Sequence, residues 1–291
     1  MSPTGCLSAS ELAFFIEHGY LVIPNWLSDL SMAAMRDAVD RIISAVDLSS
    51  VPRSVFTTDE QARTADAYFL GSGDTVRVFF EAGAFDAEGA LVQPLHESIN
   101  KIGHALHELE PEFRAVSFDP RVAALCRSLG YVQPRIVQSM HIIKPPVLGG
   151  EVRPHVDGAF LYTRPQSVLG VWWPLEACTT SNGCLWVCPG SHVRPVTRRF
   201  KRSSGGATLT EFEPPEAQPF DTAGAVPLEM AAGGAVLLHS ALVHYSEANK
   251  SSRSRHAYSV HVVEGGKGVL YPEDNWLQRS DGASFPALYG E

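Results

Sequence analysis

The segment Glu151–Gly158 (EVRPHVDG) places a histidine and an aspartate one residue apart, at His155 and Asp157. In an extended strand, residues i and i+2 point to the same face, with their Cα atoms roughly 7 Å apart. The imidazole and the carboxylate can therefore converge on one metal ion. A second imidazole from a distant strand would complete a facial triad of two histidines and one carboxylate, which leaves positions of an iron(II) ion open for substrates.

The candidate second imidazole is His244, in the segment Leu242–Ser246 (LVHYS). A His-x-Asp motif is short and occurs often by chance, and the chain has eleven histidines. The sequence around His244 therefore decides whether these residues are predicted as metal ligands. This histidine follows Ala235–His239 (AVLLH), a short apolar run after a Gly-Gly pair, which predicts a buried strand. We therefore predict His155, Asp157 and His244 as catalytic metal ligands.

A further strand is predicted by the alternating segment Ala257–Val263 (AYSVHVV), and Arg255 stands just before it. In this strand Arg255, Ser259 and His261 share one face. A strand face that carries arginine and serine is unusual for a hydrophobic core. It is typical of the lining of a polar pocket inside a small barrel.

Arg255 is a candidate anchor for a dicarboxylate co-substrate. An iron oxygenase of this kind takes electrons from 2-oxoglutarate, whose keto and C1 carboxylate oxygens bind the metal. The distal carboxylate then needs a fixed partner, and a guanidinium offers two parallel donors that match it. An ordinary surface arginine is the alternative, made plausible by Arg253 nearby. Arg255 is preferred because it stands at the start of the predicted strand, at the expected spacing after His244.

These residues lie in a chain that resembles the phytanoyl-CoA dioxygenase family of iron(II)/2-oxoglutarate oxygenases, and more narrowly its domain-containing protein 1 group. The resemblance covers nearly the whole chain, and its longer blocks are the most specific. The matching segments are Leu12–Ile23, Tyr68–Asp86, Ser98–His107 (SINKIGHALH), Val137–Lys144, Gly149–Tyr162, Leu169–Trp172, Asn182–His192 (NGCLWVCPGSH) and Asn275–Gln278. One departure is Pro195, where the family commonly has glycine, and it changes the loop after His192.

The resemblance implies a mainly β fold with flanking helices, a double-stranded β-helix (jelly roll, cupin-like) with N-terminal helices packed on one sheet. It also implies hydroxylation of an unidentified small-molecule or acyl-CoA-like substrate, with release of succinate and CO₂. Iron(II), 2-oxoglutarate and O₂ would be required, and ascorbate is expected to support activity. By the same resemblance, iron is held by His155, Asp157 and His244, and 2-oxoglutarate is contacted by Lys101, Met140, Trp172, Ser246 and Arg255.

Each of these positions can also be explained from its residue type, as a contact with 2-oxoglutarate or as a purely structural residue. Lys101 would add a second cation near an acid, although a helix lysine is usually solvated. Trp172 would form a wall of the pocket or pack in the core. Ser246 would donate its hydroxyl to a carboxylate or satisfy a turn. Met140 is the weakest candidate, because methionine more often fills gaps in a core.

The chain is expected to form a single domain over residues 1–291, helix-rich over 1–130 and a jelly-roll core over 131–291. Ser8–His18 opens with a capping box and ends at Gly19. The other expected helices are Ser31–Val46, Glu97–Leu109 and Pro120–Leu129. The expected strands are Ile136–Lys144, Ser167–Leu175, Leu185–Val187, Ala235–His239 and Ala257–Val263, and such a run of short strands is typical of a sandwich or barrel.

Composition limits the possible partners and location. With 291 residues and 45% hydrophobic content the chain can bury a full core, and a net charge of −9 argues against broad nucleic-acid binding. No run of about twenty apolar residues predicts a membrane span, and neither a signal peptide nor a C-terminal peroxisomal signal is recognised. We therefore expect a cytoplasmic protein with a small-molecule substrate. Five scattered cysteines indicate reduced thiols, not a disulfide framework or a zinc site, and the sequence leaves the oligomeric state open.

Two surface features allow two interpretations each. The basic cluster Arg194, Arg198, Arg199, Lys201 and Arg202 could attract an anionic substrate, such as the phosphates of a CoA ester. It could also be a solvated loop that the acidic residues after it neutralise, and this interpretation is favoured. The segment Ser203–Thr222 is expected to be a long loop near the pocket mouth, either a lid or disordered.

Two other classes of protein compete with the oxygenase. One is a binding protein of the same fold that keeps the iron and 2-oxoglutarate site but hydroxylates nothing. The other is a cupin-like hydrolase or isomerase that uses zinc or manganese. Arg255 and Lys101 argue against the second class, because such an enzyme has no need of a buried partner for a dicarboxylate.

Overall fold

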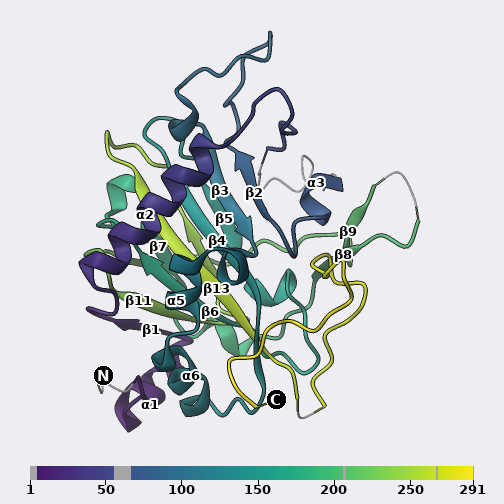
Figure 1. Cartoon of the computed structure of the whole chain (residues 1–291). Coiled ribbons are helices and arrows are strands. Elements are labelled where there is room, and N and C mark those ends of the chain that lie inside the picture. Colours follow the sequence, from purple (N-terminus) through teal and green to yellow (C-terminus); the bar gives the residue numbers. More distant parts are fainter. Residues whose placement is uncertain (1–4, 56–66, 206–207, 267, 291) are drawn as a thin grey trace.

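The computed structural model describes residues 5–55, 67–205, 208–266 and 268–290. A large antiparallel sheet forms its centre, with strands in the order β1-β11-β6-β13-β4-β3-β2 (Figure 1). The bounds of these strands are Tyr20–Ile23 (β1), Ala235–His239 (β11), Leu169–Pro174 (β6), Arg255–Glu264 (β13), Pro134–Lys144 (β4), Ile99–His104 (β3) and Val76–Phe80 (β2).

A smaller antiparallel sheet has the order β10-β7-β12-β5, and a separate hairpin pairs β8 with β9. The bounds are Val226–Leu228 (β10), Leu185–Val187 (β7), His244–Ser246 (β12), Val152–His155 (β5), Arg199–Arg202 (β8) and Thr210–Glu213 (β9). The predicted mainly β fold, a double-stranded β-helix with helices packed on one sheet, is confirmed.

The two longest helices, Ala9–His18 (α1) and Asp29–Ser44 (α2), lie near the N-terminus. The bounds of the other described α-helices are Ala67–Leu70 (α3), Leu106–Leu109 (α4), Pro111–Ser117 (α5) and Pro120–Ser128 (α6). The capping box of α1 and its left-handed C-cap at Gly19 are as the sequence predicts. Short 3-10 turns occur at Leu95–Glu97, Asp157–Ala159, Thr180–Asn182 and Ser191–Val193.

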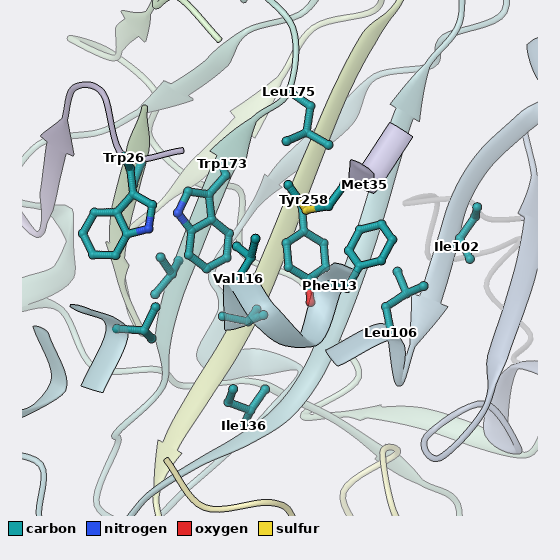
Figure 2. Packing of buried hydrophobic residues seen from close by; sticks show 14 of the residues in the cluster. Trp26, Met35, Ile102, Leu106, Phe113, Val116, Ile136, Trp173, Leu175 and Tyr258 are labelled. Atoms are coloured by element: carbon teal, nitrogen blue, oxygen red, sulfur yellow. The ribbon is translucent and has the colours of Figure 1, made fainter. Parts of the chain in front are cut away.

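The two faces of the large sheet bury different cores, and β6 illustrates the division. Trp173 points to the helix side, where it stacks on Tyr258 in a cluster that also contains Phe113 and Met35 (Figure 2). Trp172 points the other way, into the space between the two sheets. This alternation follows from the two-residue period of a strand. It leaves the inner faces of β13, β4 and β3 available to line a site between the sheets.

The prediction of a helix over Glu97–Leu109 is wrong. Residues Ile99–His104 form β3, which pairs with β2 and β4, and only Leu106–Leu109 is helical. All six residues of β3 are buried. A strand buried on both faces shows no polar–apolar alternation, so its apolar residues matched a helical period by coincidence.

Two other segments differ from the sequence interpretation. The helix-rich first part of the chain also contributes β1, β2 and β3 to the large sheet. The segment expected as one long loop over Ser203–Thr222 contains β9, which pairs with β8. Among the described residues no helix combines the length and the apolar composition that crossing a bilayer requires.

Candidate active site

His155 and His244 face each other on adjacent strands of the small sheet. His155 ends β5, His244 begins β12, and the two are register partners with ring centroids 4.2 Å apart. Asp157 opens the 3-10 turn that follows β5. One ligand atom from each of the three side chains lies within 4.8 Å of the others. The fold thus brings the three predicted metal ligands together.

Backbone carbonyls orient the two imidazoles. Nδ1 of His155 lies 2.9 Å from the carbonyl oxygen of Arg153, and Nδ1 of His244 lies 3.0 Å from that of Leu242. When Nδ1–H donates to a carbonyl, the lone pair of Nε2 is left for a metal. The two Nε2 atoms lie 3.8 Å and 3.6 Å from Oδ1 of Asp157, so all three donor atoms converge on one point.

The carboxyl group of Asp157 is buried and charged. Burial alone would raise its pKa, but the imidazoles of His261, His244 and His155 together hold the pKa below its usual range. A carboxylate must be deprotonated to bind a metal, so this environment favours the form that binds.

Arg255 lies at the start of β13 and is only 2% exposed. Its Nε donates to the carbonyl oxygen of Gly183 at 3.1 Å, and its guanidinium carbon lies 5.7 Å from the ring centroid of Trp172. Although burial lowers the pKa of Arg255, a guanidinium stays protonated in proteins. Arg255 therefore brings a buried positive charge into the space between the sheets.

Lys101 and Met140 lie side by side in the wall of a cavity. Nζ of Lys101 is 3.8 Å from Sδ of Met140 and within 6 Å of the ring centroids of Phe69 and Phe79, at 5.7 Å and 5.5 Å. Lys101 is 4% exposed, so the picture of a solvated helix lysine is wrong. It is a strand residue aimed at the cavity that Met140 also lines.

Trp172 and Ser246 are buried but do not appear in the cavity wall. Trp172 belongs to the apolar cluster between the two sheets. Ser246 lies two residues beyond His244 on β12 and therefore on the same strand face, with 2% of its surface exposed. Of the eight predicted site residues, four line the cavity (Lys101, Met140, His155 and Asp157) and the other four are buried (Trp172, His244, Ser246 and Arg255).

The cavity has a volume of about 1440 Å³. His155 and Asp157 lie in its wall, together with Lys101, Met140 and apolar side chains. A cavity that has mostly apolar walls and a few convergent polar groups is typical of a small-molecule site.

An aromatic cluster connects this wall to the β8–β9 hairpin. Phe200 and Phe212 are register partners across the hairpin, and both lie within 6 Å of the ring of Phe160, at 5.8 Å and 5.9 Å. Phe160 in turn contacts the ring of His155 edge-on, with centroids 6.0 Å apart. The hairpin therefore forms one wall of the cavity beside a predicted metal ligand.

Part of the basic cluster predicted as a solvated loop belongs to this hairpin. Arg199, Lys201 and Arg202 lie in β8, and Arg194 and Arg198 precede it. Arg199 pairs with Asp274 and, at 3.3 Å, with Glu213, while Nζ of Lys201 lies 3.0 Å from Glu213. The expected neutralisation by acidic residues is thus present, and its partners hold β8 to β9 and to the C-terminal segment. Arg194 and Arg198 line the cavity.

The donor set and two buried polar atoms fit an iron ion with a dicarboxylate. Two imidazoles and one carboxylate suit a divalent transition metal. Among the described residues, Nη1 of Arg255 and Oγ of Ser259 are buried without a hydrogen-bond partner. Buried polar atoms are normally satisfied, so this pair, on one face of β13, indicates a polar ligand between the sheets.

Sequence reasoning gave no role to His261 or Gln138, which are register partners on β13 and β4 and both line the cavity. The alternation of residues in the predicted strand could have identified His261 as a site residue, because it places His261 on the same face as Arg255.

Residues 15–257 match the family described as phytanoyl-CoA dioxygenase (PhyH). The chain belongs to the phytanoyl-CoA dioxygenase family. A relative from Bos taurus, phytanoyl-CoA dioxygenase domain-containing protein 1, is 46% identical over 293 residues, which covers 98% of this chain and 99% of the relative.

Solved structures share the fold at lower identity. EctD from S. alaskensis with bound Fe has a TM-score of 0.64 and 20% identity, covering 100% of this chain and 89% of that one. The epimerase SnoN, in complex with Fe³⁺, alpha ketoglutarate and nogalamycin RO, has a TM-score of 0.62 and 17% identity, covering 96% and 98%. Membership of the phytanoyl-CoA dioxygenase family makes the chain an oxidoreductase of the dioxygenase type, while the substrate stays open.

Proposed function

We propose that this protein is an iron(II)- and 2-oxoglutarate-dependent dioxygenase that hydroxylates a small-molecule substrate and releases succinate and CO₂. The observation that carries the proposal is the convergence of His155, Asp157 and His244 in the same barrel as the buried cation of Arg255. A metal site alone would fit several reactions. The metal site together with a buried guanidinium that has an unpaired Nη1 fits a dicarboxylate co-substrate.

His155, Asp157 and His244 would hold the iron, through Nε2 of each imidazole and Oδ1 of the carboxylate. Iron(II) with 2-oxoglutarate supplies the activation of O₂, chemistry that the side chains lack. The protein's part is to bind and orient the reactants. The carbonyls of Arg153 and Leu242 fix the imidazoles, and the low pKa of Asp157 keeps its carboxylate charged.

Arg255 would pair with the distal carboxylate of 2-oxoglutarate. His261, whose ring contacts Asp157, lies six positions beyond Arg255 on β13, so their Cα atoms are roughly 20 Å apart along the strand. An extended arginine side chain and a five-carbon dicarboxylate can together bridge much of that length. Ser259 lies between them on the same face, with a hydroxyl that has no partner among the described residues.

The remaining predicted contacts have roles that follow from their places. Lys101 would add positive charge from the cavity wall, next to Met140. Trp172 would shield the guanidinium of Arg255 from water by lying against it. Ser246 would offer a hydroxyl on the same strand face as His244. Charge and water exclusion together strengthen each electrostatic contact in such a site.

The substrate would enter the cavity beside the aromatic cluster of Phe160, Phe200 and Phe212. The volume of the cavity, about 1440 Å³, is large for a metabolite of a few carbon atoms and accommodates an extended molecule. Arg153 and Arg194 in its wall favour an anionic group on that molecule, such as the one a CoA-like ester carries. We therefore propose a substrate with an apolar reacting part and an anionic end.

A zinc or manganese hydrolase on the same fold would leave Arg255 without a role.

The test of the proposed function is anaerobic titration of the iron(II)-loaded protein with 2-oxoglutarate, monitored by the visible charge-transfer absorption of an iron(II)–2-oxo acid chelate. The proposal predicts this absorption in the wild type, its loss in His155→Ala and weaker binding in Arg255→Gln. Metal binding without any chelate absorption in the wild type would contradict it.

A further inference from the structure

A third imidazole lies near the candidate metal-binding carboxylate, at a different oxygen from the one that the two predicted histidine ligands face. His261 lies on β13, is 5% exposed and lines the cavity. Its Nε2 is 3.3 Å from Oδ2 of Asp157. The other oxygen, Oδ1, faces Nε2 of His155 and of His244, at 3.8 Å and 3.6 Å.

His261 is not itself placed as a ligand of the same ion. Among the described residues, the group whose ligand atoms all lie within 4.8 Å of one another contains His155, Asp157 and His244, without His261. The two carboxylate oxygens of Asp157 therefore have different surroundings. Oδ1 belongs to the convergent donor set, and Oδ2 is turned toward β13.

Gly170 on β6 makes room for this orientation. It is the register partner of His261, and a Cβ atom added to it would lie 3.0 Å from Oδ2 of Asp157. A contact of that length is tighter than ordinary van der Waals distance. The carboxylate is thus held between a glycine on one strand and an imidazole on the next, and a side chain in place of Gly170 would push Oδ2 away.

We propose that His261 is a positioning residue that donates its Nε2–H to Oδ2 of Asp157 and so restricts the carboxylate to a single metal bond through Oδ1. The distance of 3.3 Å is slightly long for an N–H···O hydrogen bond, and Oδ2 has no aligned donor among the described residues. Hydrogen bonds in ligand-free active sites commonly shorten and align when the reactants bind. Neutral imidazole with its proton on Nε2 and imidazolium both donate from this atom, so the role does not depend on the charge of His261.

The consequence concerns the number of open metal positions, and it rests on the proposed function. The metal would need open positions for a 2-oxo acid and for O₂, and the three protein ligands would leave them. A second metal bond from Asp157 would take one of these positions. A donor on Oδ2 would compete with that second bond.

The experiment compares His261→Phe, which removes the donor, with His261→Gln, which keeps an N–H donor. His256→Phe is the matched control, because it removes an imidazole from the same strand on the opposite face, where His256 contacts His141. Two affinities are measured for each protein. One is for Co²⁺ alone, from its visible absorption, and the other is for 2-oxoglutarate on the anaerobic iron(II)-loaded protein, from the chelate absorption.

We expect His261→Phe to weaken 2-oxoglutarate binding about 10-fold while its Co²⁺ affinity stays within about threefold of the wild type, since partners of a metal ligand typically contribute 10- to 100-fold. His261→Gln should recover most of the loss, and His256→Phe should match the wild type. Gly170→Ala, which displaces Oδ2 without removing any donor, should show the same selective loss and covers the case in which His261→Phe does not fold.

Equal 2-oxoglutarate affinity in the wild type, His261→Phe and Gly170→Ala would overturn the inference. A parallel fall of both affinities, not recovered by His261→Gln, would also overturn it, because that result indicates a general structural role. These outcomes differ from failure of the proposed function, in which the wild type itself would give no chelate absorption.

Discussion

His155 and His244 are direct register partners across β5 and β12, although they come from distant parts of the sequence. Their rings lie 4.2 Å apart, and Asp157 reaches the same point from the turn after β5. The three candidate ligands converge only when the small sheet is paired. Metal binding and folding of this sheet should therefore be coupled.

A bound divalent ion should raise the stability of the wild type. A ligand that binds only the folded state at 100 times its Kd stabilises by about 2.7 kcal/mol, so Co²⁺ or Mn²⁺ should raise the thermal midpoint by several degrees. Calorimetry with and without metal measures the effect. His155→Ala should lose it, and an equal shift in that variant would argue against the site.

Substitution of Arg255 by glutamine should weaken the use of 2-oxoglutarate and leave metal affinity unchanged. A hydrogen bond to a charged group contributes about 1.5–3 kcal/mol, which corresponds to a rise in the KM for 2-oxoglutarate of roughly 10- to 150-fold. Arg253→Gln, in the turn before β13, is the matched control and should behave as the wild type. If the two variants gave the same KM, the assignment of Arg255 would fail.

The core between the helices and the large sheet should respond strongly to loss of Phe113, which is fully buried against Tyr258 with ring centroids 4.7 Å apart. Phe113→Ala should lower the free energy of unfolding by about 3–5 kcal/mol, measured by urea denaturation. Ile16, which is 64% exposed on α1, provides the comparison. Ile16→Ala should change stability by no more than about 0.5 kcal/mol, and a similar loss in both variants would contradict the packing described.

Stability should fall as the pH is lowered below about 6.5, the ordinary pKa of histidine in an unfolded chain. Burial first, and then the charges of Arg279 and Arg114, lower the pKa of His107 in the folded state to about 3. Between these two values the unfolded chain binds a proton at His107 that the folded protein does not. Each such group therefore lowers the free energy of unfolding by about 1.4 kcal/mol for each pH unit between these two pKa values. Above about pH 6.5 the group has no such effect.

Urea denaturation at about pH 7.5 and about pH 5.5 checks this expectation, with His107→Gln showing a smaller loss than the wild type. His96→Gln is the control, because the side chain of His96 is 49% exposed. An identical pH dependence in the wild type and His107→Gln would show that His107 does not contribute.

The sequence predicted β4, β6, β7, β11 and β13, because their residues alternate or form short apolar runs. The expected strands did not include β5 and β12, the short strands that carry His155 and His244. Residues Ala235–His239 form β11 as predicted, and Arg255 begins β13, which also contains the predicted segment Ala257–Val263. The spacing of His155 and Asp157 predicted their convergence, although Asp157 lies in a 3-10 turn after the strand.

Tertiary contacts explain what the sequence did not predict. Lys101 was interpreted as a helix residue because β3 is buried on both faces and lacks alternation. The ion pairs of Arg199 and Lys201 depend on Asp274 and Glu213, whose proximity no local pattern indicates. The contact of His261 with Asp157 likewise requires the register of β13 against β6, which places His261 opposite Gly170.

The decisive test of the proposed oxygenase is formation of succinate from 2-oxoglutarate by the purified protein with iron(II), ascorbate and O₂. Wild type is compared with His155→Ala and Arg255→Ala, first alone and then with acyl-CoA esters as candidate substrates. We expect iron-dependent succinate formation in the wild type that both variants lose. Full activity in His155→Ala, or none in the wild type with any substrate despite bound iron and 2-oxoglutarate, would contradict it, and the second result would favour a binding protein.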